Sequence, residues 1–300
     1  FVVNQRGAKR AVVEKAYKNN ISQAIELPQN LYDEGVDIII KTKFNKDYKF
    51  LNLNKSVIFY RYKDRKGLNI DKIDRFQLSK IKFFPRTYLS GDLIFQQLAK
   101  GVYYRPNKLS DFNSSLLTNI AQVISVLSSL KNHEVKIADY LTNFEFSNVE
   151  DPLNSKIINT FILLLKNYPH EDIRTTLTHG DFKFEHLFTL DNQLEYVVDW
   201  ENVGLRSIFF DLLNFFVPWF VNRSYNYSQI KNFIHKFIQD YLPHLQDSIL
   251  DKYDLYFSVY ALERYMRISG ARTSEFDLDA AYKRYNLLLK NLSDEVYPKN

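Results

Sequence analysis

One stretch of the chain, LTHGDFKFEHLF at residues 177–188, decides the fold class. It interrupts a region whose apolar residues otherwise recur at the three- and four-residue spacing of helices. A turn follows at Asp191-Asn192, and the chain then runs through YVVDWE at residues 196–201. Two short apolar segments on either side of a polar turn predict a β-hairpin at this place.

The predicted hairpin concerns two acidic residues that lie just outside its strands. The tripeptides LFT (187–189) and YVV (196–198) would pair, which brings the two ends of the hairpin together. Asp181 precedes the first strand, and Asp199 follows the second strand 18 positions later. We therefore expect the two carboxylates to face one cleft.

Two carboxylates and a lysine in this arrangement suit phosphoryl transfer. That reaction needs little covalent chemistry from the protein and much positioning. One carboxylate orients the attacking hydroxyl, a second holds Mg²⁺ across the nucleotide phosphates, and a cation neutralises the transferred group. Asp181, Asp199 and Lys183 can supply these three roles.

The same residues carry a resemblance to a known family. His179-Gly180-Asp181 with Asp199-Trp200-Glu201 resembles the HGD…(I/V)DWE signature of the aminoglycoside/choline-kinase-like phosphotransferases, which have a protein-kinase-like fold. DFKFEH at residues 181–186 is similar to the DLKPEN catalytic loop of protein kinases. Within the family, the wording looks closest to members associated with polysaccharide biosynthesis.

Further segments extend the resemblance over residues 92–220. Phe210-Asp211-Leu212-Leu213 looks like the Y-D-L element of the family, whose acid is structural. DLIFQQLAKG at residues 92–101 looks like the hinge, whose backbone pairs with adenine. Residues 116–130 fall where the family has its first long C-lobe helix.

The resemblance implies a kinase that moves the terminal phosphate of ATP or GTP to a hydroxyl of a small molecule or glycan. Asp181 would be the catalytic base, Asp199 a ligand of Mg²⁺ or alternatively Mn²⁺, and His179 a residue that packs the loop. The hinge side of the nucleotide site would consist of four consecutive residues: Phe95, Gln96, Gln97 and Leu98.

The lysine that contacts the phosphates is harder to assign. The family places it on an N-lobe strand and pairs it with a helix glutamate. Lys63 is our assignment, and the alternatives are Arg61, Lys41, Lys9 and Lys15. No glutamate lies between Lys41 and the hinge, which leaves Asp71 or Asp74 as the acidic partner.

One residue departs from the family pattern. The family has a metal-binding asparagine five residues after the catalytic aspartate, where this chain has His186. Imidazole suits Zn²⁺ or Mn²⁺ better than Mg²⁺, which prefers oxygen. Either His186 binds a metal through its neutral nitrogen, or one Mg²⁺ site is lost. Loss would mean a one-metal kinase, a changed metal preference, or a catalytically impaired pseudokinase that serves as a scaffold.

The whole sequence predicts an α+β, two-lobed architecture. Residues 1–98 read as a small antiparallel β-rich N-lobe, and residues 99–300 as a mostly helical C-lobe that holds the catalytic loop and the acceptor site. The predicted strands of the N-lobe are 36–44, 48–53, 56–63, 81–88 and 92–98, with a helix within 70–81. The predicted C-lobe helices are 116–130, 157–165, 209–220, 230–241, 253–268 and 278–289, with Pro218 kinking or ending one of them.

Composition limits the partners and the chemistry. The 300 residues carry a formal net charge of +5, which favours anionic partners such as nucleotides. The basic residues are spread along the chain, so we expect no nucleic-acid partner. The absence of cysteine excludes thiolate catalysis and disulfides. No apolar run reaches the length of a membrane span, although peripheral association stays open, and no signal peptide is visible at Phe1. We therefore expect a cytoplasmic protein.

Overall fold

The computed structural model describes residues 35–41, 48–61, 70–91, 93–103, 106–142, 167–168, 170–246 and 250–270. The chain divides into two compact units. Unit 1 comprises Phe1–Gly101 and Glu195–Glu201, and unit 2 comprises Val102–Leu194 and Asn202–Asn300. The segment that contains Asp199 therefore belongs to the same unit as the first hundred residues.

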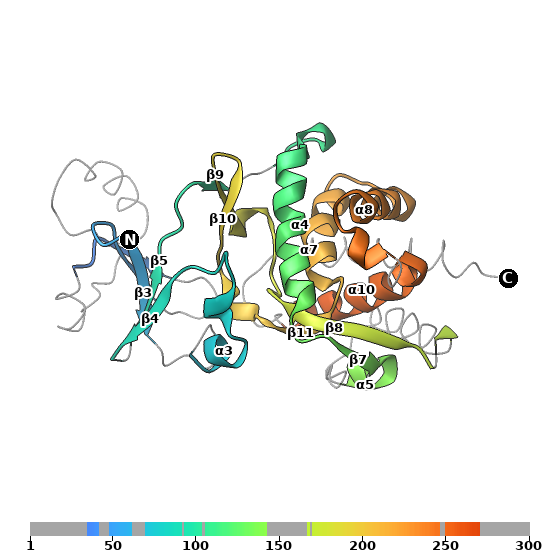
Figure 1. Cartoon of the computed structure of the whole chain (residues 1–300), viewed down its shortest axis with the longest axis horizontal. Helices are drawn as coiled ribbons and strands as arrows, with labels where there is room; N and C mark the ends of the chain where they lie inside the picture. Colours follow the sequence, from blue (N-terminus) through green and yellow to red (C-terminus); the bar gives the residue numbers. More distant parts are fainter. Residues whose placement is uncertain are drawn as a thin grey trace. The chain divides into compact units, whose positions relative to one another are not determined.

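Unit 1 is built on a five-stranded antiparallel sheet (Figure 1) with the strand order β1-β2-β3-β5-β4. The strands are β1 (Ile38–Lys41), β2 (Tyr48–Asn52), β3 (Val57–Arg61), β4 (Thr87–Ser90) and β5 (Leu93–Gln97). Side chains that alternate along β2, β3 and β5 point to one face, because successive residues of a strand point to opposite faces. On that face Phe59 stacks on Phe50 and on Phe95, with ring centroids 5.5 and 5.0 Å apart.

The connection between β3 and β4 differs from the prediction. The helix predicted within 70–81 is present as α3 (Ile70–Arg75) followed by the 3₁₀ turn η1 (Leu78–Lys80). The strand predicted at 81–88 is wrong over its first half, since Phe84 N donates to Ile81 O in a turn and β4 begins at Thr87. Phe83 and Phe84 are both buried and both contact the ring of Trp200.

Unit 2 contains the long helices, which are α4 (Ser114–Ser129), α7 (Phe210–Val221), α8 (Tyr227–Tyr241) and α10 (Tyr253–Gly270). They confirm the predicted helices 116–130, 209–220, 230–241 and 253–268. The predicted helices 157–165 and 278–289 lie outside the described residues. The shorter helical elements are η2 (Leu109–Asp111), α5 (Ile137–Thr142), η3 (Phe184–His186), η4 (Trp200–Asn202), η5 (Pro243–Leu245) and η6 (Leu250–Lys252).

Pro218 does not end α7, which continues to Val221. Proline lacks an N–H group, so it cannot donate the helical hydrogen bond to the carbonyl of Asn214. Asn222 N still donates to Pro218 O at 3.1 Å, and α7 is buried along most of its length. The burial of this apolar helix therefore outweighs one missing hydrogen bond.

A second sheet, which the sequence pattern did not predict, supports the loop that carries Asp181. It has the antiparallel order β11-β8-β7, with β7 at His133–Lys136, β8 at Asp172–Thr178 and β11 at Gly204–Ser207. The central strand β8 lies against α4, because Thr176 Oγ1 donates to the carbonyls of Leu127 at 2.6 Å and Leu130 at 2.7 Å.

The predicted hairpin is confirmed. β9 (Leu187–Leu190) and β10 (Gln193–Val197) form a sheet of order β10-β9-β6 with the short strand β6 (Val102–Tyr103). The turn residues Asp191 and Asn192 have φ angles of 51° and 63°, which these two residue types tolerate better than most.

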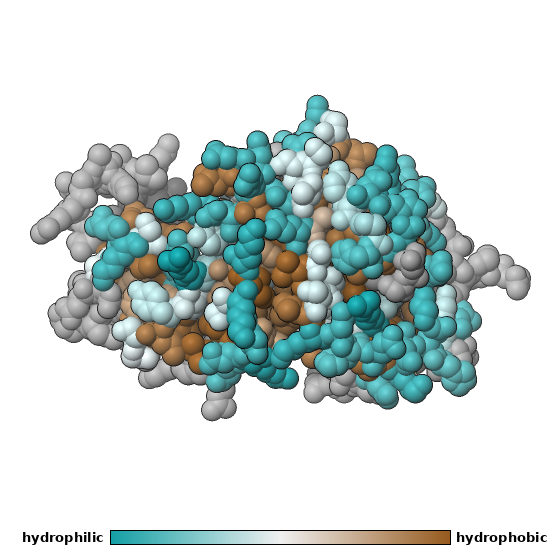
Figure 2. All heavy atoms as spheres, in the orientation of Figure 1, coloured by the Kyte–Doolittle hydropathy of each residue, from teal (hydrophilic) through white to brown (hydrophobic). Residues whose placement is uncertain are grey.

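The surface of the described residues is mostly polar on the face drawn in Figure 2, with apolar residues showing between the polar ones. The exposed large apolar side chains are Tyr88, Leu89, Val102, Tyr103, Leu109, Leu190 and Leu205. Within the part of the chain that the structure describes, no helix has both the length and the apolar character to cross a bilayer.

Candidate active site

The loop between β8 and β9 carries Asp181, and aromatic side chains of the loop anchor it to the core of unit 2. Phe182 and Phe184 point into the core and pack on Phe215 of α7, with ring centroids 4.7 and 4.2 Å apart. Because the residues on either side of Lys183 are buried, Asp181 and Lys183 are left half-buried at the edge of unit 2. The side chain of Asp181 is 18% exposed.

Asp211, in the first turn of α7, fixes the start of this loop. Its two carboxylate oxygens accept hydrogen bonds from the backbone amides of His179 at 2.6 Å and Gly180 at 2.9 Å. Burial raises the pKa of Asp211, while His179 and the two amides act in the opposite direction. A carboxylate that binds two consecutive amides determines where the peptide planes before Asp181 lie.

Gly180 meets a steric requirement at this point. Its φ angle is +81°, in the left-handed region that residues with a side chain rarely adopt. A Cβ atom added to it would collide with the carbonyl oxygen of Asn202 and would lie 2.6 Å from Nη1 of Arg206. Glycine is therefore the residue that lets the loop approach β11 this closely.

The electrostatic surroundings of Asp181 favour its ionised form. Lys183 Nζ donates to Asp181 Oδ2 at 2.8 Å. Burial by itself raises the pKa of Asp181, but Lys183, and to a smaller extent His186 and Arg264, more than offset it, so that the pKa lies below its ordinary value of 3.8. Asp181 is therefore an ionised hydrogen-bond acceptor at neutral pH.

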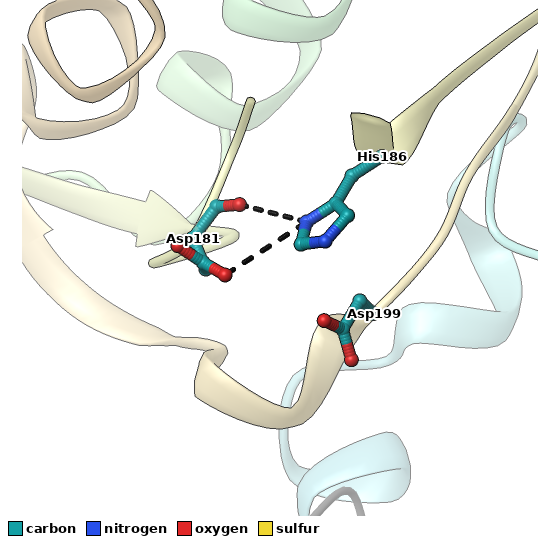
Figure 3. Close-up of side chains that lie close together, drawn as sticks. All are labelled: Asp181, His186 and Asp199. Atoms are coloured by element: carbon teal, nitrogen blue, oxygen red, sulfur yellow. Dashed lines mark hydrogen bonds and ion pairs between the residues drawn. The ribbon is translucent and has the colours of Figure 1, made fainter. Parts of the chain in front are cut away.

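The imidazole ring of His186 points toward Asp181 (Figure 3). Its Nδ1 lies 2.9 Å from the carbonyl oxygen of Asp181 and 4.0 Å from Oδ2 of the same residue. A carbonyl oxygen only accepts hydrogen bonds, so this contact requires the proton on Nδ1. In the neutral ring the lone pair then resides on Nε2, which is the arrangement found in metal-binding histidines.

Asp199 lies in unit 1, directly after β10, and is held in a different way. Its neighbour Trp200 is buried against Phe83 and Phe84, with ring centroids 6.1 and 5.6 Å apart, and donates from Nε1 to Val197 O at 2.6 Å. Asp199 itself has a φ angle of 67°, in the left-handed region that aspartate tolerates better than most residues.

Lys49 of β2 is a functional candidate that the sequence pattern missed. Its Nζ lies 2.7 Å from Glu201 Oε1 and 3.8 Å from Asp199 Oδ1. Burial lowers the pKa of Lys49, but the two carboxylates outweigh it and raise the pKa above 10.5. The backbone of Glu201 is also held, since its carbonyl accepts from Lys72 Nζ at 2.6 Å. No local feature of YKFLN marks the lysine, because its partners lie some 150 positions later in the chain.

Lys63, to which we assigned the phosphate contact, lies outside the described residues, as do Lys9 and Lys15. Lys41 and Arg61 end the strands β1 and β3. The assignment of Lys63 is therefore still a prediction, whereas Lys49 is the lysine that the structure describes beside Asp199 and Glu201.

The four predicted hinge residues lie at the end of β5, an interior strand of the unit 1 sheet. Phe95 is buried between β3 and β4 partners, and Gln96 Nε2 donates to Thr87 Oγ1 at 3.3 Å. The amide of Gln97 donates to Arg86 O at 2.8 Å, and the amide of Leu98 donates to Ser56 O at 2.9 Å. The amides of Gln97 and Leu98 thus have partners within unit 1, and the adenine contact at the four hinge residues stays a prediction.

Three described side chains have the chemistry of metal ligands. Asp181, His186 and Asp199 each offer one ligand atom of the kind that divalent cations bind. The two carboxylates suit Mg²⁺ or Mn²⁺, and the imidazole suits Mn²⁺ or Zn²⁺. Asp181 and His186 thus offer such donors in unit 2 and Asp199 offers one in unit 1, with the imidazole as the group that Mg²⁺ prefers least.

A comparison with family models finds one match. Residues 133–249 match the model described as "Phosphotransferase enzyme family". The matched residues include the loop with Asp181, the segment with Asp199, and Asp211. This confirms the resemblance over that part of the chain. No protein with a curated description matches the sequence.

Solved structures share the fold. A thermostable mutant of aminoglycoside phosphotransferase APH(4)-Ia, in the apo form, has a TM-score of 0.59 at 13% identity, with 91% of this chain and 100% of that chain covered. Amicoumacin kinase hAmiN in complex with AMP-PNP, Ca²⁺ and Ami has a TM-score of 0.58 at 15% identity, with 97% and 96% covered. Choline kinase LicA from Streptococcus pneumoniae has a TM-score of 0.58 at 14% identity, with 94% and 99% covered. These likenesses confirm the predicted α+β, protein-kinase-like fold.

Proposed function

We propose that this chain, which shares its fold with aminoglycoside phosphotransferases and choline kinase, moves the terminal phosphate of ATP or GTP to a hydroxyl of a small molecule or glycan. The observation that carries the proposal is the environment of Asp181. The residue follows a buried strand, its loop is fixed by Asp211 and by aromatic packing, and its carboxylate is kept ionised by Lys183. A fixed, ionised carboxylate at a loop edge is the group that can orient a hydroxyl for attack.

Asp181 and Lys183 have complementary parts in the proposed reaction. Asp181 accepts the hydrogen bond of the acceptor hydroxyl and takes its proton as the new O–P bond forms, while the bond from the terminal phosphorus to its bridging oxygen breaks and the nucleoside diphosphate leaves. Lys183 holds the carboxylate at 2.8 Å and brings a positive charge to the place where the transferred phosphoryl group is negative. Asp211 takes no direct part, and it determines the position of the loop through the amides of His179 and Gly180.

Asp199 and His186 are the proposed ligands of the divalent cation, Mg²⁺ or Mn²⁺. When bound, the cation neutralises charge on the nucleotide phosphates. His186 is suited to this by its tautomer, since the hydrogen bond to Asp181 O leaves the lone pair on Nε2. The proposal requires Asp199 and Asp181 to act on the same nucleotide.

Lys49 is the residue that we propose for the phosphate contact, in preference to Lys63. Kinases use a strand lysine that is paired with a glutamate, and Lys49 of β2 is paired with Glu201 at 2.7 Å. The partner differs from the expected aspartates, because it comes from the segment after β10 rather than from a helix of the first hundred residues.

The structural neighbours support a nucleotide and a small acceptor. One structure of APH(4)-Ia, with a TM-score of 0.57 at 12% identity, is a ternary complex with AMP-PNP and hygromycin B. The amicoumacin kinase complex also holds AMP-PNP and a divalent cation. We infer from these a nucleoside triphosphate and a hydroxyl-bearing small molecule for this chain. A glycan acceptor in polysaccharide biosynthesis and a cytoplasmic location stay predictions from the sequence.

The replacement of Asp181 by asparagine tests the proposal. D181N keeps the shape of the side chain but cannot accept a proton, so we expect turnover to fall by about 10²–10⁴ while the dissociation constant of the nucleotide changes by less than about threefold. The measurement is nucleotide hydrolysis and transfer with Mg²⁺ and with Mn²⁺, together with calorimetric nucleotide binding. D191N, in the exposed turn between β9 and β10, is the matched control and should leave both unchanged.

The alternative function is a pseudokinase scaffold, and His186 is the observation that favours it. The variant H186N restores the oxygen ligand of the family. An active enzyme with a histidine ligand should respond with a shifted metal preference, toward Mg²⁺. A degenerate site should respond with a large gain of activity from a silent wild type. A wild type that binds nucleotide but never turns over with any metal or acceptor contradicts the proposed kinase.

A further inference from the structure

Beneath the catalytic loop, unit 2 contains a buried ion pair that the proposed chemistry does not use. Arg206 of β11 and Glu263 of α10 lie with Nε and Oε1 2.9 Å apart, and their side chains are only 10% and 2% exposed. A buried ion pair costs desolvation free energy and is a weak contributor to stability by itself. Stability alone therefore does not account for this buried pair.

The second carboxylate oxygen of Glu263 is also engaged. Tyr140 of α5 donates its hydroxyl proton to Glu263 Oε2 at 2.8 Å, and the same hydroxyl oxygen accepts from the amide of Ser207 at 3.1 Å. Glu263 is thus bound from β11 and from α5, and both of its oxygens have directed partners. Its position is fixed relative to the strand that carries Arg206.

The other end of the arginine reaches the catalytic loop. Arg206 Nη1 donates to Oγ1 of Thr178, the last residue of β8, at 2.7 Å. The same nitrogen occupies the space beside Gly180, where an added Cβ would lie 2.6 Å from it. The guanidinium also lies over the ring of Phe210 at 5.1 Å. Arg206 therefore contacts the two positions that precede Asp181 by three and by one residue.

We propose that Glu263 is a positioning residue for Asp181, and that it acts by holding the Arg206 guanidinium against Thr178 and Gly180. The inference rests on the proposed function, because the loop that it positions is the one that carries the proposed base. Helix α10, which carries Glu263, thereby affects the position of Asp181 without contacting it.

The charges around Arg206 explain why Glu263 is needed and not only tolerated. Asp211 is the acid that holds the amides of His179 and Gly180. Burial raises the pKa of both Asp211 and Glu263, and the positive charge of Arg206 acts against it in both. The ion pair of Arg206 is with Glu263 at 2.9 Å, so loss of that charge releases the guanidinium, and its contacts with Thr178 and beside Gly180 are no longer fixed. A displacement of about 1 Å at a reacting group can cost about a hundredfold in rate.

The test compares two carboxylate-to-amide substitutions on the same helix. E263Q keeps the size of the side chain and removes the charge that faces Arg206. D254N, in the first turn of the same helix, removes an ion pair with Lys231 (2.7 Å) that has no link to the loop. We expect E263Q to lower kcat by about tenfold to a hundredfold with the nucleotide KM within about threefold, and D254N to leave both within about twofold.

A second pair of variants tests the link where no buried charge is left alone. T178V removes the hydroxyl that accepts from Arg206 Nη1, and T178S keeps it. T178V should lower kcat by about tenfold, and T178S should restore the wild-type value. This pair decides the question if E263Q does not fold, because Glu263 and Arg206 stay paired in it.

Hydrogen exchange separates a failed inference from a failed function. The amides of residues 179–181 should exchange at least tenfold faster in E263Q than in the wild type and in D254N, whether or not an acceptor is known. Equal exchange, or a kcat that falls no further in E263Q and T178V than in D254N and T178S, overturns the positioning role. A wild type without any phosphoryl transfer overturns the proposed function instead, and the exchange rates then decide alone whether Glu263 holds the loop.

Discussion

The segments that carry Asp181 and Asp199 both have aromatic support, but their polar contacts differ in burial. The loop of Asp181 in unit 2 is held by directed bonds to buried charges, namely Asp211 to two amides and Arg206 to Thr178. The segment of Asp199 in unit 1 is held by the burial of one indole, Trp200, against two phenylalanines and by contacts of Lys49 and Lys72 with Glu201. The charges near Asp199, those of Lys49 and Glu201, are about a quarter exposed.

The difference teaches how each segment can respond to change. Hydrogen bonds to a carboxylate depend on direction, so they hold peptide planes in one orientation and fail sharply when a partner is removed. Burial of an aromatic ring is not directional and gives stability with some freedom of position. The first kind of support suits the role of base that we propose for Asp181, and the second suits the role of metal ligand that we propose for Asp199.

The largest effect is expected where the apolar support is removed. W200A deletes a side chain that is 1% exposed, which should lower the free energy of unfolding of unit 1 by about 3–5 kcal/mol. Urea denaturation with amide exchange of β3 and β5 measures this. W200F keeps part of the ring packing and loses the bond to Val197 O and some buried area, so it should cost less, about 1–2 kcal/mol. Equal losses in the two variants would show that the indole bond, not the burial, holds the segment.

Loss of the hydrogen bonds to Asp211 should lower stability less than loss of the Trp200 side chain, but it should also lower activity. D211N retains one acceptor oxygen and places an amide group against the second backbone N–H, which should cost about 2–3 kcal/mol and lower kcat by at least about tenfold. D240N makes the same chemical change at an exposed site of α8 and should be neutral within about 0.5 kcal/mol. Thermal denaturation and steady-state kinetics test both. A D211N enzyme with wild-type kcat is not compatible with a loop fixed by these two bonds.

A glycine pair sharpens the steric part of the comparison. Gly180 and Gly91 both have positive φ angles, of 81° and 60°, but an added Cβ is crowded at Gly180 and meets nothing within 4 Å at Gly91. G91A therefore measures the backbone cost alone, about 1 kcal/mol, and G180A should cost about 1–2 kcal/mol more. Chemical denaturation of both variants gives the difference. If the two values agree, Arg206 and Asn202 yield to the new methyl group and the crowding has no consequence.

The smallest expected effect is a pH dependence of stability that comes from His235. His235 of α8 packs edge-on against Tyr253 of α10, with ring centroids 4.8 Å apart. Burial and then Lys231 lower the pKa of His235 below 6.5, and Asp254 acts weakly in the opposite direction.

The sign of this dependence follows from proton binding. Below pH 6.5 the unfolded chain binds a proton at His235 more readily than the folded chain does. The contribution of His235 to the free energy of unfolding is therefore fully present above pH 6.5 and is lost as the pH falls. In H235N this part of the slope should disappear, while W200F should keep it. The measurement is urea denaturation between pH 5 and 8. Parallel curves for the wild type and H235N are the contrary result.

The sequence predicted the parts of the fold whose pattern is local. The spacing of apolar residues located α4 within two residues of its observed bounds, and the turn at Asp191-Asn192 located the β9–β10 hairpin. The sheet of β7, β8 and β11 was missed because β8, DIRTTLT, buries threonines in place of an apolar alternation, and their hydroxyls donate to the carbonyls of His133, Leu127 and Gly204.

The site was predicted as far as motifs reach. The signature located Asp181, Lys183 and Asp199 as candidates, and it identified Asp211 as a structural acid. Lys49 and the Arg206–Glu263 pair could not be found, since each depends on two segments that are distant in sequence and meet only after folding. A lone buried arginine in a short strand carries no pattern that a motif could record.

The division of unit 1 into two stretches of sequence has a consequence for biosynthesis. Phe83 and Phe84 are translated long before Trp200, the residue that covers them. A nascent chain that has emerged only to Gly101 lacks Trp200 and Glu201, so Phe83, Phe84 and Lys49 cannot yet make these contacts. The contacts of the smaller unit are therefore complete only after translation has passed Glu201.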